Sequence, residues 1–141
     1  MPFKKGFLAR APFAVCWSQQ VAAATLATTN GVFANPLANT EIYEFLGADY
    51  SYDVLSTSGT LDLRNVVTAT AFTGGVTLLS ATGDLNATAR VARKAGITTT
   101  LQDRRIMPGS HLSLILGGTL TSLVGLSVVI WLQAMRGIRG R

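Results

Sequence analysis

The chain has few charged residues, a single cysteine and a single histidine, and these shortages limit the classes of protein it can be. Only 13% of its 141 residues are charged, against about 25% in typical soluble domains. With Cys16 alone, neither an intrachain disulfide nor a cysteine-cluster metal site can form. With His111 alone, the chain cannot supply the paired cysteines and histidines of the common zinc sites.

Three long blocks of the sequence contain no permanently charged side chain. Residues 11–40 and 65–83 carry no charged side chain, and His111 is the only ionisable residue in 111–135. An ion at the centre of a bilayer costs at least about 2.5–3.5 kcal/mol, so charge-free blocks are typical of membrane spans. The pattern therefore predicts a mainly α, small integral membrane protein in a bacterial inner membrane or an organelle inner membrane.

The three blocks differ in how well they fit a membrane helix. Residues 112–132, LSLILGGTLTSLVGLSVVIWL, are uncharged and long enough to cross the bilayer, so they predict a transmembrane helix. Residues 65–83 predict a second one, although their threonines and valines also favour strands. Residues 12–30 predict a helix that either spans the membrane or packs at its interface, because Gln19 and Gln20 are costly in lipid.

These helices divide the chain into five segments. Residues 1–34 are expected to form a basic start and an apolar helix, and whether they act as a retained targeting signal or as a membrane segment stays open. Residues 35–64 form an acidic extramembrane part, with a short helix over 40–47. Residues 65–83 form the second span, 84–111 a basic loop or surface helix, and 112–141 the last span with its basic tail. The number of spans, one to three, and their orientation stay open. The predicted interface anchors are Trp131, Arg136, Arg139 and Arg141.

Small residues recur at every fourth position in two of the predicted helices. Such stripes let membrane helices approach closely and hydrogen-bond to one another. We therefore predict helix-packing faces made of Ser113, Gly117, Gly118, Thr121, Ser122 and Gly125 in one helix, and of Ala69, Thr73, Thr77 and Ala81 in the other.

Motifs that would indicate chemistry are missing from the sequence. The glycines match neither a Walker nor a dinucleotide pattern, and no carboxylate lies within a predicted span. The basic residues flank apolar runs instead of lining an aromatic groove, so no nucleic-acid partner is expected. We predict no catalytic residue, no metal site and no resident cofactor. The weak alternative is that His111 ligates a pigment or a haem.

The functional hypothesis follows from the membrane interpretation. The layout resembles small accessory subunits of energy-converting membrane complexes. It predicts a non-catalytic structural subunit of a respiratory, photosynthetic or ATP-synthase complex, with other membrane subunits and the lipid bilayer as partners. The alternatives are a self-assembling membrane protein, such as a pilin-like secretion subunit or a virion membrane protein, and a pigment- or haem-binding subunit.

Overall fold

Strands make up almost all the regular structure of this protein. The computed structural model describes residues 10–20 and 28–135. Within these residues the six long strands are β1 (Phe13–Gln19), β2 (Thr29–Ala34), β3 (Tyr43–Ser51), β4 (Ser58–Val66), β9 (His111–Thr119) and β10 (Leu126–Ala134). Shorter elements lie between β4 and β9: β5 (Val76–Thr77), β6 (Gly83–Asp84), β7 (Arg93–Lys94), the 3-10 turn η3 (Leu101–Arg104) and β8 (Arg105–Ile106).

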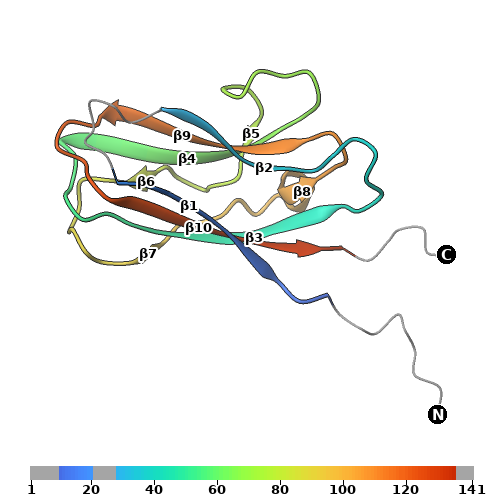
Figure 1. Ribbon diagram of the computed structural model, residues 1–141, viewed down its shortest axis with the longest axis horizontal. Helices are drawn as coiled ribbons and strands as arrows, with labels where there is room; N and C mark the ends of the chain where they lie inside the picture. Colours follow the sequence, from blue (N-terminus) through green and yellow to red (C-terminus); the bar gives the residue numbers. More distant parts are fainter. Residues whose placement is uncertain (1–9, 21–27, 136–141) are drawn as a thin grey trace, which may run out of the picture.

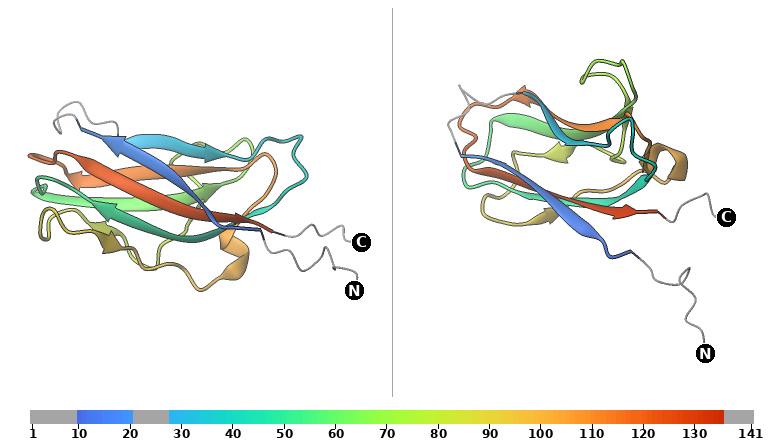
Figure 2. Two further views of the ribbon diagram at one scale, coloured as in Figure 1. Left: turned by 60° about the horizontal axis from the view of Figure 1, so that its bottom comes forward. Right: turned by 45° about the vertical axis from the view of Figure 1, so that its right-hand side comes forward.

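The strands form two antiparallel sheets that pack face to face (Figure 1). The first sheet, sheet A, has the order β1-β10-β3-β7, with β8 also paired to β3. The second, sheet B, has the order β2-β9-β4-β5, with β6 also paired to β4. Along the chain β1 to β4 alternate between the sheets, whereas β9 pairs with β4 in sheet B before β10 returns to sheet A. Figure 2 shows the two sheets from two further directions. This order is that of a jelly roll, a sandwich of two interleaved Greek keys.

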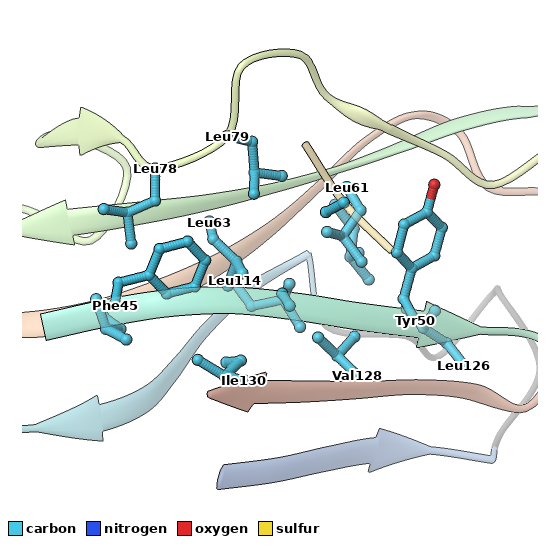
Figure 3. Packing of buried hydrophobic residues seen from close by; sticks show 14 of the residues in the cluster. Phe45, Tyr50, Leu61, Leu63, Leu78, Leu79, Leu114, Leu126, Val128 and Ile130 are labelled. Carbon is cyan, nitrogen blue, oxygen red and sulfur yellow. The ribbon is translucent and has the colours of Figure 1, made fainter. Parts of the chain in front are cut away.

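The core lies between the sheets and is made by alternate residues of each strand. In β9 these are Leu112, Leu114 and Leu116, and along β10 every second residue from Leu126 to Leu132 is buried. Figure 3 shows side chains of β3, β4, β9 and β10 meeting in this layer. Burying each such side chain contributes about 1.5–3 kcal/mol, so this layer is the main source of stability.

The prediction of transmembrane helices is wrong. Residues 112–132 contain most of β9, a turn and most of β10, and residues 65–83 contain the end of β4, a loop and β5. In the described part of the chain, no helix has the length and apolarity needed to cross a membrane. The run 112–132 is apolar because β9 and β10 place alternate side chains in the core of the sandwich, whereas residues 67–77 of the other run are exposed or only partly buried. The integral-membrane location that rested on these helices is wrong with them.

The other predicted helices are also absent from residues 10–20 and 28–135. Within 12–30, the described residues form β1 and the start of β2, while 21–27 lie outside the described residues. Residues 43–51, expected to begin as a helix, form β3. The basic segment 84–111 is an irregular connection with β7, η3 and β8, not a surface helix.

Candidate functional site

A long loop folds over the outer face of sheet B. This segment, residues 67–75, is called here the Phe72 loop, and it rises above β5 in Figure 1. The Ser113 hydroxyl of β9 donates a hydrogen bond of 2.7 Å to the carbonyl oxygen of Phe72. The Arg64 guanidinium of β4 donates one of 2.6 Å to the carbonyl oxygen of Thr73. Two neighbouring strands therefore hold the loop against the sheet.

The side chain of Phe72 lies against the two strands next to its loop. Its ring centroid is 4.3 Å from that of His111 in β9. On β2, a Cβ atom added to Gly31 would lie only 2.7 Å from Phe72 Cε2. The glycine thus makes room for the ring at this point of the sheet.

Beside Phe72 lies a pocket of about 600 Å³ at one end of the sandwich. One wall is the connection after β2, which Asn35 holds in place: its buried Nδ2 donates 3.0 Å hydrogen bonds to the carbonyl oxygens of Glu41 and Ile106. The lining is mostly apolar and comprises Gly31, Phe33, Ala34, Asn35, Pro36, Leu37, Thr68, Phe72, Gly109, Ser110 and His111. Such a cavity suits an apolar group more than a charged one.

His111 lines this pocket from the first position of β9. Its Nε2 is buried and has no hydrogen-bond partner within the part of the chain that the structure describes. A haem or pigment bound at Nε2 would require this enclosed atom to become accessible, and therefore Phe72 or another neighbour to move. The ligand role of His111 stays a prediction.

Exposed apolar side chains surround the pocket mouth and continue beyond it. Leu37 is 73% exposed and Val67 57%, and both are unusually exposed for large aliphatic residues. A second cavity, of about 430 Å³, adjoins the first at Ser110. We call the exposed residues of both cavities the apolar rim: Leu37, Val67, Phe72, Val76 and Met107. The second cavity is also lined by Gln102, Asp103 and Arg105, so polar and charged groups lie among these residues. Exposed apolar side chains gathered beside polar ones are typical of contacts with another molecule.

The residues predicted to form helix-packing faces have other roles. Ser113, Gly117 and Gly118 belong to β9, and Thr121, Ser122 and Gly125 lie in the connection from β9 to β10. Ala69 and Thr73 belong to the Phe72 loop, Thr77 to β5, and Ala81 to the connection before β6. Because none of these segments is helical, the helix-packing prediction is wrong, although the structure does bring Ser113 to the Phe72 loop.

In the part of the chain that the structure describes, there is no spanning helix for the predicted membrane anchors to flank. Trp131 lies on the outward face of β10, 38% exposed, and its Nε1 donates a 3.2 Å hydrogen bond to Asp49 Oδ2 on β3. Arg136, Arg139 and Arg141 lie outside the described residues. Trp131 is therefore a surface residue of sheet A.

Charged groups outside the pocket pair with one another. Asp62 accepts a 2.9 Å hydrogen bond from Arg64 Nε and a 2.5 Å one from the Thr77 hydroxyl, which joins β4 to β5. At the surface, Asp53 raises the pKa of Arg90 through a 2.7 Å hydrogen bond and its charge. Within residues 10–20 and 28–135, no group of three His, Cys, Asp or Glu side chains is placed to hold a metal. Of these contacts, the hydrogen bond from Thr77 to Asp62 joins two strands, the Arg64–Asp62 pair lies within β4, and the Arg90–Asp53 pair lies between two connections.

Comparison with known proteins identifies a shared architecture. No family model and no curated protein matches this chain. A solved structure titled "Cyanophage Pam1 capsid asymmetric unit" matches with a TM-score of 0.50 and 11% sequence identity. The match covers 96% of this chain and 93% of the other. The two chains share a fold. That neighbour belongs to a protein assembly, and the prediction of a helical membrane subunit is wrong.

Proposed function

We propose that this protein is a non-catalytic structural subunit of a capsid-type protein shell. The observation that carries the proposal is the near-complete match, along both chains, to a chain of a phage capsid. A match over such lengths concerns the whole sandwich, not a fragment common to many β-proteins. The jelly-roll order of the two sheets supports the same conclusion, since this architecture recurs in viral capsid domains.

The surface of the sandwich suits a role in contacts between subunits. The apolar rim exposes Leu37, Val67 and Met107 beside a mostly apolar pocket. Two residues of the rim, Val67 and Phe72, belong to the Phe72 loop, which hydrogen bonds hold to β4 and β9. A firmly held apolar surface loses little conformational entropy when a neighbouring subunit covers it. The partners in this proposal are therefore other protein subunits of the shell.

The test is to look for the chain in purified particles. Nuclease-treated particles from the source are banded by density, and the chain is quantified by mass spectrometry against the most abundant shell protein. We expect a fixed ratio to that protein, and symmetric density for the sandwich in cryo-electron microscopy of the same particles. Absence of the chain from the particle band, with the chain recovered in the unassembled fraction, would overturn the proposal.

A further inference from the structure

The two sides of the sandwich differ in how their sheet edges are protected. On one side the edges consist of the two-residue strands β5, β6, β7 and β8. Three of these strands carry charge: β6 has Asp84, β7 has Arg93 and Lys94, and β8 has Arg105. Short, charged edge strands are a common means by which β-proteins avoid pairing with another chain.

On the opposite side, the described residues include no such short, charged edge strand. Here the edges are β1, with seven residues, and β2, with six. Both strands fall within the charge-free block 11–40, and neither contains a proline. Such an edge is a ready template for a further strand.

Of these two edges, β1 is the better template. Its register with β10 is uninterrupted from Phe13 to Gln19. The register of β2 with β9 shifts between Gly31 and Phe33, where a bulge interrupts the ladder. Bulges twist an edge and disturb further pairing, whereas the outward backbone groups of a regular strand lie in one row. In the described part of the chain, β1 forms a ladder with β10 alone.

The side chains of β1 are also incompletely covered. Phe13, Val15 and Trp17 face the core and pack against it, yet each is only partly buried. On the outward face, Ala14, Cys16 and Ser18 are small and exposed. A strand added beside β1 would cover more of the apolar row without meeting a bulky or charged side chain on the other face.

We propose that β1 is a self-association site, at which the β1 strands of two copies pair antiparallel across a two-fold axis and join two A sheets into one. The proposal deepens the proposed function, on which it rests for the expectation that subunits contact one another. A second copy fits because β1 is complementary to itself. A two-fold axis at Cys16, the central residue, pairs all seven positions: Phe13 with Gln19, Ala14 with Ser18, Val15 with Trp17, and Cys16 with Cys16 of the second copy.

These pairs are of favourable kinds. The pairing of Val15 with Trp17 brings a β-branched side chain beside an aromatic one, which stabilises neighbouring strands. The pairing of Ala14 with Ser18 brings together two small side chains, and no pair contains two like charges, because β1 has none. Each unlike pair forms twice by symmetry, as in most homodimers.

Cys16 provides a direct test of this register. Residues directly opposite one another in an antiparallel pair have Cα atoms about 4.5–5.5 Å apart, within the roughly 4.4–6.8 Å found in disulfides. We therefore expect copper-phenanthroline to convert the full chain into a disulfide-linked dimer on a non-reducing gel. The two thiols lose two protons, and their two electrons pass to the added oxidant.

Variants with shifted cysteines distinguish this register from random collision. In the double variant A14C/C16S, the two introduced thiols would lie four residues apart along the strands, about 13 Å, and should not cross-link. In the triple variant A14C/C16S/S18C, the thiol introduced at position 14 of one copy would face the thiol introduced at position 18 of the other, and the dimer should form again. Equal cross-linking of A14C/C16S and the natural chain would overturn the proposal.

A second measurement does not depend on oxidation. Under reducing conditions, light scattering after size-exclusion chromatography should give about twice the mass of the chain. Replacing Cys16 with Lys would place two ammonium groups opposite each other and should return the mass to that of one chain. T119K adds the same charge at an exposed residue at the end of β9 and should leave the dimer intact. Circular dichroism of both variants would show that the sandwich is folded.

The outcomes separate this proposal from the proposed function. A chain that is present in particles but has a one-chain mass and no Cys16 cross-link overturns the β1 interface alone. A chain that forms the Cys16-linked dimer but is absent from particles overturns the capsid-type function alone.

Discussion

The ring of Phe72 lies against the ring of His111, with centroids 4.3 Å apart and planes tilted by 46°. The contact joins a surface loop to the first residue of β9, and Phe72 is still 42% exposed. Replacing Phe72 with Ala removes the aromatic contact and the buried part of the ring. We expect a loss of about 1–2 kcal/mol in the free energy of unfolding, measured by urea denaturation.

Leu37 offers the control for this change. It lines the same pocket but is 73% exposed, so Leu37→Ala should change the free energy of unfolding by no more than about 0.5 kcal/mol. If both variants lose the same amount, the Phe72 loop is not held by its ring.

Gly117 and Gly118 are neighbours in β9 but should respond differently to substitution. Gly118 has a φ of +71°, and an added Cβ atom would lie 2.2 Å from the carbonyl oxygen of Ser58. At Gly117 the nearest atom to an added Cβ is the Thr60 hydroxyl, a side-chain atom 3.1 Å away that can move. We expect Gly118→Ala to cost about 2 kcal/mol or more through steric contact and a left-handed backbone, and Gly117→Ala under about 1 kcal/mol.

Urea denaturation followed by tryptophan fluorescence measures both variants. A packed helix face would make both glycines sensitive, because both would allow close approach of a second helix. Similar losses at the two positions would therefore contradict the strand geometry of β9.

The spacing of the leucines in β9 is that of a strand, but the lack of charged residues between them makes the segment resemble a membrane helix. Leu112, Leu114 and Leu116 alternate with other residues, as in a strand with one buried face. In most sandwiches the intervening residues are polar or charged, which makes the alternation clear. Here Ser113 lies under the Phe72 loop and Ile115 is half-buried, so the outward residues are also small or apolar. A run with both faces uncharged fits a membrane helix equally well by composition.

The candidate site is even harder to predict from the sequence than the fold. Gly31, Phe72 and His111 come from separate parts of the chain, and nothing in their spacing predicts that they meet. The contact depends on the pairing of β2 with β9 and on the path of the Phe72 loop. His111 was singled out only because it is the one histidine, and its position in a pocket follows from the sheet order, which sequence patterns do not determine.

Asn35 should be among the most sensitive polar residues. Its buried amide nitrogen donates to two carbonyl oxygens, of Glu41 and Ile106, and these bonds hold one wall of the pocket. Asn35→Ala leaves both carbonyl oxygens without this donor, at a cost of about 2 kcal/mol or more. Asn86→Ala, at an exposed position before β7, is the matched control and should be nearly neutral. Thermal unfolding of the two variants would show the difference, and an unchanged melting temperature for Asn35→Ala would contradict it.

Val128 and Val129 give the sharpest test of the sandwich, because adjacent residues of the same type should differ in sensitivity. Val128 faces the core and is fully buried, whereas Val129 faces outward and is only partly buried. Replacement of either by Ala lowers strand propensity equally, but only Val128→Ala leaves a cavity. We expect a loss of about 2–3 kcal/mol at Val128 and under about 1 kcal/mol at Val129.

Substitution by threonine at the same two positions tests the effect of a polar group without a change of side-chain shape. Val→Thr keeps the branched shape but introduces a hydroxyl group, which costs about 1–3 kcal/mol where it is buried without a partner. Val128→Thr should therefore be destabilising and Val129→Thr nearly neutral, as measured by chemical denaturation. In a lipid-embedded helix both valines would lie in an apolar environment, so equal losses at both positions would argue for a helix, and unequal losses support the alternating faces of β10.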